Sequence, residues 1–287
     1  MCGGTAGRVR WRAAVGDDTE VRPSSEQFGA TLGVTMRCDA CGHTSLAVAP
    51  PAEVLAETYA DTVDPVSLRE EAGQVETARR TLAATEPFVR PGRILDLGCW
   101  TGSLLVAARE RGWDGVGVEP SVWASERARA RGLDVVTAPW QQHGQAAGTF
   151  DLVAMCDVIE HLVDPGAALD EIAHLLAPGG GVVLTVPDAG SRLARALGKR
   201  WWSVLPMHVQ YFTRASLTRL LIDHGYEVRL TRTHAKVFSA QYYVERLAGY
   251  ARVLDRAGQA VLSVARQRDR LVAPDFRDRL LVVATRP

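Results

Sequence analysis

One short segment holds the residues whose types and spacing point most clearly to ligand chemistry. It reads Arg93-Ile-Leu-Asp-Leu-Gly-Cys-Trp-Thr-Gly-Ser-Leu-Leu105, an apolar run followed by a turn and a second apolar run. Gly98 and Gly102 permit backbone conformations and a close ligand approach that a Cβ atom would block. Asp96 ends the first run, where its carboxylate can accept hydrogen bonds from turn amides or from a ligand ammonium group. The segment therefore predicts a buried strand, a tight ligand-binding turn and a helix.

Trp100 and Glu119 narrow the kind of ligand that fits this turn. Dinucleotide sites use the spacing G-x-G-x-x-G, in which small residues let a pyrophosphate rest on the start of a helix. Here the spacing is Asp-x-Gly-x-x-x-Gly with Trp100 inside it, and a bulky indole disfavours a pyrophosphate but tolerates an aminoacyl nucleoside. About 20 residues further on, a second apolar run ends at Glu119, and an acid at that distance can hold both hydroxyls of a ribose.

These motifs resemble those of class I S-adenosylmethionine-dependent methyltransferases, in particular the broad group that includes small-molecule O-methyltransferases. The resemblance runs from about Arg93 to Val186 and continues more loosely to the end of the chain. The usual loop of this family reads G-C-G-x-G, so Trp100 replaces its middle glycine. The resemblance implies that the loop holds the methionine part of S-adenosylmethionine and that the following acid binds the ribose. The residues implied are Asp96, Gly98, Cys99, Trp100, Gly102, Glu119 and Pro120.

Two further segments are expected beside the cofactor. After the third apolar run the family often places an acid near the adenine amine, whereas this chain has Ala138-Pro-Trp140. Trp140 either stacks on the adenine or is an ordinary core or surface tryptophan. The segment Thr149–Leu162 resembles the fourth-strand motif of the family. Because the carboxyl ends of parallel strands face the ligand crevice, we expect Cys156 and Asp157 beside the cofactor and the methyl acceptor.

Asp157, Glu160 and His161 follow an i, i+3, i+4 pattern that would place them on one face of a helix. Two carboxylates and an imidazole can bind a divalent cation. Ubiquinone-pathway O-methyltransferases carry a similar triplet and use a metal, which makes Mg²⁺ one interpretation. Metal-free relatives carry the same Glu-His pair, where it caps and packs the helix, and we favour this second interpretation.

The aromatic segment Trp201–Thr213 follows the fifth apolar run, and in the resembled family such a segment usually covers the acceptor site. His208 is our first candidate for a general base, since a neutral imidazole can take a hydroxyl proton near pH 7. The alternative is a histidine that only hydrogen-bonds to the backbone. Asp157 and His161 are further catalytic candidates. The sulfonium is an activated donor, so alignment alone can supply much of the rate.

Three cysteines near the start of the chain suggest a structural metal site. Cys38-Asp-Ala-Cys41-Gly is a zinc knuckle, and Cys2-Gly-Gly is similar to the second half of another. Methyltransferases of this type often begin with a two-knuckle zinc ribbon. The fourth ligand would be His43, a water or a cysteine preceding this sequence. The alternative is a degenerate ribbon that folds without metal.

From Arg93 onward, short apolar runs alternate with helical stretches. This alternation indicates a parallel sheet with helices on both faces, which would position the residues described above. The resemblance implies a Rossmann-like sheet of seven strands, the last antiparallel. We expect a zinc-ribbon-like module at 1–50, a helical extension at 51–90, and the catalytic domain at 91–287 with a helical insertion at 238–270.

Composition restricts the function classes further. The chain has 287 residues, 33 basic and 33 acidic, so no net charge draws it to nucleic acid. No run of 18 apolar residues and no secretion signal are present, and five cysteines are an odd number, which together predict a cytoplasmic protein without a transmembrane segment.

The sequence thus predicts methyl transfer from S-adenosylmethionine to a small molecule, foremost at the oxygen of a sugar, a lipid-linked compound or a secondary metabolite. The amphipathic stretch 238–270 would pack on its own domain, shape the acceptor pocket, form a homodimer or contact a lipid-linked substrate. The alternative from another class is a cofactor-binding regulatory or scaffolding protein without catalysis.

Overall fold

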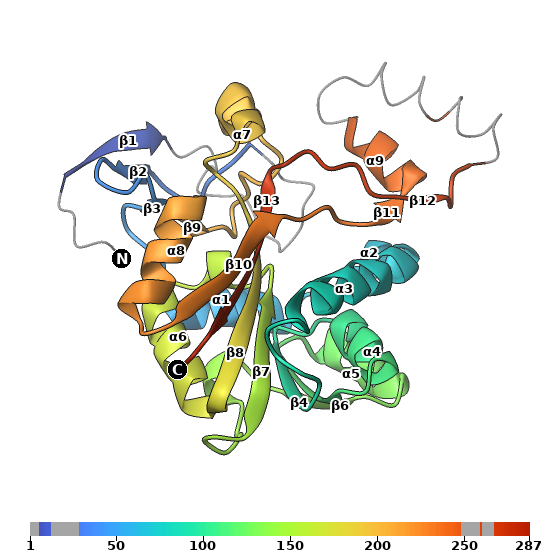
Figure 1. Cartoon of the computed structure of the whole chain (residues 1–287). Coiled ribbons are helices and arrows are strands. Elements are labelled where there is room, and N and C mark those ends of the chain that lie inside the picture. Colours follow the sequence, from blue (N-terminus) through green and yellow to red (C-terminus); the bar gives the residue numbers. More distant parts are fainter. Residues whose placement is uncertain (1–5, 13–28, 248–258, 260–266) are drawn as a thin grey trace.

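A seven-stranded sheet forms the centre of the computed structural model, which describes residues 6–12, 29–247, 259 and 267–287 (Figure 1). Its strand order is β10-β13-β8-β7-β4-β5-β6. The neighbouring pairs from β6 to β8 are parallel, and β13 is antiparallel to both β8 and β10. This confirms the predicted sheet with an antiparallel last strand. The strands are β4 (Arg93–Leu97), β5 (Asp114–Glu119), β6 (Asp134–Thr137), β7 (Phe150–Cys156), β8 (Leu176–Pro187), β10 (Glu227–Thr233) and β13 (Arg279–Thr285).

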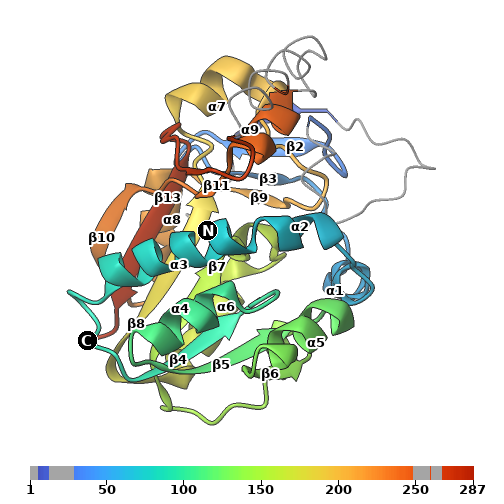
Figure 2. The ribbon, with the colours of Figure 1, turned by 90° about the vertical axis from the view of Figure 1, so that its right-hand side faces the viewer.

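Helices cover both faces of this sheet because its central strands are apolar on both sides. One face packs on α6 (Pro165–Leu175) and α8 (Arg214–Asp223), and the other on α3 (Glu71–Thr85) and α4 (Ser103–Glu110) (Figures 1 and 2). Along β7, Val153 and Met155 join the first cluster, whereas Leu152 and Ala154 join the second, as the two-residue period of a strand requires. Near the β5–β6 edge, α5 (Val122–Ala130) supplies the buried Ala128.

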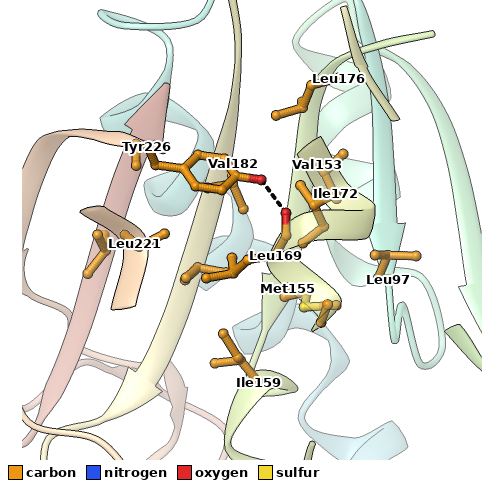
Figure 3. Close-up of a cluster of buried hydrophobic side chains, with 14 of the residues drawn as sticks. Leu97, Val153, Met155, Ile159, Leu169, Ile172, Leu176, Val182, Leu221 and Tyr226 are labelled. Atoms are coloured by element: carbon orange, nitrogen blue, oxygen red, sulfur yellow. Dashed lines mark hydrogen bonds between the residues drawn. The ribbon is translucent and has the colours of Figure 1, made fainter. Parts of the chain in front are cut away.

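The core beneath α6 is closed by a buried hydrogen bond (Figure 3). Leu169 and Ile172 of α6 pack against Met155 and Val182 of the sheet, all with side chains removed from solvent. The hydroxyl of Tyr226 donates to the carbonyl oxygen of Leu169 at 2.7 Å. This bond joins the turn before β10 to α6.

A second, antiparallel sheet joins the N-terminal segment to the catalytic half of the chain. Its order is β1-β2-β3-β9, with β1 (Gly7–Trp11), β2 (Thr35–Cys38), β3 (Thr44–Leu46) and β9 (Gln210–Tyr211). The Gln210 amide nitrogen donates to the carbonyl oxygens of Leu162 and Val163, each at 3.1 Å, and its Oε1 lies 2.9 Å from Nε2 of the buried His43. The N-terminal strands are therefore tied to the loop that follows β7.

Cys38 ends β2 and Cys41 lies in the turn that leads to β3. Gly42 has φ +71°, and its N–H donates to the Cys38 carbonyl at 3.0 Å, which closes the turn. Cys2 lies outside the described residues, so the zinc ribbon stays a prediction.

The segments around the site complete the fold. In the predicted insertion, β11 (Phe238–Ser239) pairs with β12 (Leu271–Val272) and is followed by α9 (Ala240–Leu247), while 248–258 and 260–266 lie outside the described residues. Residues 178–181 lie inside β8 at an irregularity, where the partner of β7 moves from Leu176 to Gly181. Within the described ranges, no helix combines the length and apolarity that crossing a bilayer requires. The remaining helices are α1 (Ala52–Ala60), α2 (Pro65–Arg69), α7 (Arg192–Leu197), η1 (Trp140–Gln142), η2 (Ile159–His161) and η3 (Gly198–Arg200).

Candidate functional site

A cavity of about 650 Å³ lies at the carboxyl ends of β4, β5 and β7. It brings together most of the residues that the sequence singled out. Those lining it are Asp96, Gly98, Cys99, Trp100, Glu119, Pro120, Trp140, Cys156, Asp157 and His161. Gly102 and His208 are not among the lining residues. The positions of all twelve follow from the strand ends, because parallel strands deliver their following loops to one edge of the sheet.

The turn after β4 keeps a glycine-like backbone although Trp100 occupies its centre. Trp100 has φ +50°, a left-handed conformation that costs a non-glycine residue roughly 1–2 kcal/mol. Its indole Nε1 donates to Ser67 Oγ at 3.1 Å, which helps to hold the conformation. Gly98 has φ +77°, and a Cβ there would meet Val158 Cγ2 at 2.6 Å. At Gly102, φ is +80° and a Cβ would meet Leu133 Cδ1 at 2.2 Å, so this glycine serves packing of the turn.

Glu119 ends β5 with both carboxylate oxygens held in place. Oε2 accepts a hydrogen bond from the Trp100 N–H at 2.9 Å, and Oε1 accepts one from the Ser121 N–H at 2.8 Å. Burial raises the pKa of Glu119 to about 7, against the lowering effect of these two hydrogen bonds. Each oxygen keeps a lone pair, so the carboxylate can also accept from the two hydroxyls of a ribose.

Asp96, at the end of β4, is a buried carboxyl suited to a cationic ligand. Its side chain is 2% exposed, and burial, together with the proximity of Glu119, raises its pKa to about 8. A nearby positive charge favours the ionised form of such a group. An ammonium group in the cavity would therefore restore the negative charge of Asp96.

Asp157 follows β7 directly and lies between two cationic side chains. Its carboxylate forms ion pairs with Lys236 and Arg279. The expectation that Asp157 shares a helical face with Glu160 and His161 is corrected: Asp157 has φ +60°, and the short helix η2 begins only at Ile159. The spacing was right for a helix, but the chain turns through a left-handed residue before the helix starts.

His161 is the imidazole that lines the cavity. Its Nδ1 lies 3.0 Å from the carbonyl oxygen of Met207 and 2.7 Å from the hydroxyl of Tyr59, which also lines the cavity. Because a carbonyl can only accept, a hydrogen bond to Met207 requires the tautomer with the hydrogen on Nδ1, which leaves a lone pair on Nε2. Burial lowers the pKa of His161 to about 4, so the ring is neutral at pH 7.

His208 lies behind His161, with ring centroids 4.6 Å apart. It is 6% exposed, its Nδ1 is 2.8 Å from the carbonyl oxygen of Ser203, and burial lowers its pKa well below the ordinary value. His208, the first candidate for the general base, therefore lies behind the cavity wall, whereas His161 lies at the cavity surface. Sequence reasoning did not single out Tyr59, Lys236 or Arg279. Tyr59 matched only the apolar period of a helix, and the two cations carry no motif.

Glu160, His161 and His208 offer ligand atoms within 4.8 Å of one another, the one such group of three within the described ranges. Glu160 Oε2 is buried without a hydrogen-bond partner, and burial raises its pKa to about 8. A carboxylate with two imidazoles is a donor set that fits a divalent transition metal.

Comparison with known proteins identifies the family of the chain. Residues 69–231, more than half of the chain, match the family described as "Methyltransferase domain". The ubiquinone biosynthesis O-methyltransferase of Psychrobacter arcticus is 30% identical over 155 residues, which cover 47% of this chain and 58% of that protein. The corresponding enzyme of Aeromonas salmonicida is 29% identical over 167 residues, covering 52% and 69%. The chain thus spans only a little over half the length of the first of these relatives.

Solved structures show the same fold. A SAM-dependent methyltransferase from Archaeoglobus fulgidus superimposes with a TM-score of 0.52 at 20% identity, covering 78% of this chain and all of that chain. A chain of the complex between the Haloferax volcanii Trm112 methyltransferase activator and a methyltransferase gives 0.54 at 18% identity, covering 84% and 100%. With its strand order, its glycine turn and the family match over 69–231, the chain belongs to the class I S-adenosylmethionine-dependent methyltransferases.

Proposed function

We propose that this methyltransferase transfers the methyl group of S-adenosylmethionine to a hydroxyl oxygen of a small acceptor, and that His161 takes the hydroxyl proton. The observation that carries the proposal is that Glu119, Asp96 and His161 line the same cavity. Similarity to ubiquinone biosynthesis O-methyltransferases supports oxygen as the acceptor atom. A sugar, a lipid-linked compound or a secondary metabolite would suit the volume of about 650 Å³.

The cofactor is assigned to the end of the cavity formed by β4 and β5. Glu119 binds the ribose hydroxyls through its two fixed oxygens, and Asp96 lies near the ammonium group. The adenine lies along Pro139 and Trp140, which line the same end. The methyl group then faces the part of the cavity bounded by Asp157 and His161.

His161 acts from a fixed orientation. Its Nδ1–H bond to Met207 and its contact with Tyr59 hold the ring, and Nε2 accepts the proton as the oxygen–methyl bond forms. A pKa of about 4 makes this a weak base, so alignment of oxygen, methyl and sulfur supplies most of the rate. His208 supports the ring of His161 from behind and makes no contact with the acceptor.

Two metals belong to the proposal as secondary elements. A divalent cation held by Glu160, His161 and His208 would engage the Nε2 lone pair of His161, so it would replace His161 as the base and polarise the acceptor hydroxyl as a Lewis acid. A structural zinc ion would be held by the thiolates of Cys2, Cys38 and Cys41.

The test uses S-adenosylmethionine carrying a carbon-13 methyl group and a metabolite extract as the source of acceptor. The chemical shift of the transferred methyl separates O-, N- and C-methyl products. His161→Asn keeps an N–H for Met207 but has no atom at Nε2, so we expect kcat to fall about 100-fold. His208→Asn, the matched control, should fall much less. An N- or C-methyl product refutes oxygen as the acceptor atom, and an unchanged kcat in His161→Asn refutes the base.

A further inference from the structure

Two cations share one carboxylate at the acceptor end of the cavity. Lys236 pairs with Oδ2 of Asp157 and Arg279 pairs with Oδ1, so both carboxylate oxygens are occupied. The side chains of Lys236 and Arg279 are only 30% and 15% exposed. One carboxylate balances one cation, so this trio has an excess positive charge in a poorly hydrated place, where charges are costly unless paired.

The neighbouring carboxyl does not cancel that excess. Glu160, the other carboxyl near Lys236, forms no ion pair with Lys236 or Arg279 in the described residues, and its Oε2 is buried without a hydrogen-bond partner. Burial lowers the pKa of Lys236, and the positive charge of Arg246 in α9 adds to this lowering, so an anion beside Lys236 would stabilise its charged form. Among the described residues, the local balance is therefore cationic.

The excess charge is accessible from the cavity through Lys236. Lys236 lines the cavity together with Asp157 and His161. The neighbouring lining residues Thr77 and Thr81 donate to carbonyl groups of their own helix, so the attraction for an anion comes from the charge of Lys236. Behind Lys236, Arg279 Nε is buried and has no hydrogen-bond partner in the described part of the chain. A ligand at Lys236 thus meets a positive charge and the imidazole of His161.

We propose that Lys236, oriented by Asp157 and backed by Arg279, binds an anionic group of the methyl acceptor, so that the substrates of this enzyme are small carboxylates or phosphates. This inference rests on the proposed function, because it presumes that the acceptor occupies the cavity beside His161. Charge-assisted hydrogen bonds are the strong ones in water-poor sites, so the anion would fix the acceptor in register with the sulfonium. Asp157 is a positioning residue here.

The cofactor has a carboxylate of its own, and the experiment separates the two sources. The protein is first titrated with S-adenosylhomocysteine by calorimetry. The loaded protein is then titrated with 3,4-dihydroxybenzoate and with 3,4-dihydroxybenzamide, which have nearly the same shape and differ in charge. We expect the benzoate to bind about tenfold more tightly than the amide, the difference of one charge-assisted hydrogen bond.

Three variants assign this preference to its source. Lys236→Met should bind both compounds equally, while Lys236→Arg, which keeps the charge, should retain most of the preference. Lys199→Met removes the other lysine of the chain, which donates to the Arg12 carbonyl outside the cavity, and should behave as the unaltered protein. S-adenosylhomocysteine should bind all three variants with unchanged affinity, which also shows that they are folded.

Equal binding of the two compounds by the unaltered protein, or binding of neither, overturns the inference. A tenfold loss of S-adenosylhomocysteine affinity in Lys236→Met also overturns it, since Lys236 would then hold the cofactor carboxylate. If S-adenosylhomocysteine does not bind the unaltered protein at all, the proposed function itself has failed, and the two failures are thereby distinct.

Discussion

Replacing Glu119 by alanine removes the group to which we assign the ribose. Both of its oxygens are fixed by backbone N–H donors, at 2.9 and 2.8 Å, so a bound ribose meets acceptors that need no rearrangement. A hydrogen bond to a charged group contributes about 1.5–3 kcal/mol, and relief of the buried carboxylate offsets part of the loss. The net cost is about 1–3 kcal/mol, which weakens binding roughly 5- to 150-fold.

Calorimetric titration with S-adenosylhomocysteine at pH 8 measures this change. Glu126→Ala is the matched control, because Glu126 is an exposed acid on α5 outside the cavity. Circular dichroism of both variants checks that the turn after β4 still folds when the Trp100 N–H loses its acceptor. Affinity within twofold of the unaltered protein in Glu119→Ala would refute the assignment of Glu119 to the ribose.

The raised pKa of Glu119 predicts that cofactor affinity depends on pH, and the same titration repeated at several pH values measures this dependence. Burial raises this pKa from an ordinary 4.5 to about 7, so the folded protein binds more protons than the unfolded chain between these values. The contribution of Glu119 to the stability of the unliganded protein is therefore present below pH 4.5 and lost as pH rises through about 7. The cofactor needs the ionised carboxylate, so its affinity should fall below about pH 7, and this slope should be smaller in Glu119→Ala.

Two further predictions concern stability and metal content. Tyr226→Phe removes the 2.7 Å hydrogen bond to the Leu169 carbonyl, and should lower the free energy of unfolding in urea by about 1 kcal/mol without changing cofactor affinity. An undiminished unfolding free energy would show that this bond contributes nothing net. Protein purified without chelators should contain about one zinc ion per chain by elemental analysis, and Cys38→Ser with Cys41→Ser should contain none. Metal-free protein that is equally stable would favour the degenerate ribbon instead.

Much of the fold could be predicted because its signals are local. A seven-stranded sheet with an antiparallel last strand was expected and is present, with β13 as that strand, and Gly98 and Glu119, which the sequence singled out, line one cavity. Apolar periodicity and glycine spacing are properties of neighbouring residues, so the sequence displays them directly.

The acceptor end could not be predicted in the same way because it is assembled from distant segments. Tyr59 meets His161 across 102 positions of the chain, and Lys236 and Arg279 meet Asp157 from the other end of the sequence. Nothing in the residue types reveals that Asp157 adopts φ +60°, which removes it from the helical face that its spacing suggested. His208 was the more conspicuous histidine in sequence, yet only the fold shows that His161 stands in front of it.

Because β3 pairs with β9, removing the first fifty residues would disturb the part of the chain that remains. The Gln210 Oε1 accepts a hydrogen bond from His43, and its Nε2 donates to the carbonyl oxygens of Leu162 and Val163. Gln210 therefore connects the N-terminal sheet to the residues directly after His161. A shortened enzyme starting after Pro51 would expose the edge of β9 and leave the Gln210 oxygen without its donor. Anyone who trims this protein for crystallisation or biocatalysis should therefore expect looser placement of His161, and should keep the N-terminal strands or engineer a substitute for His43.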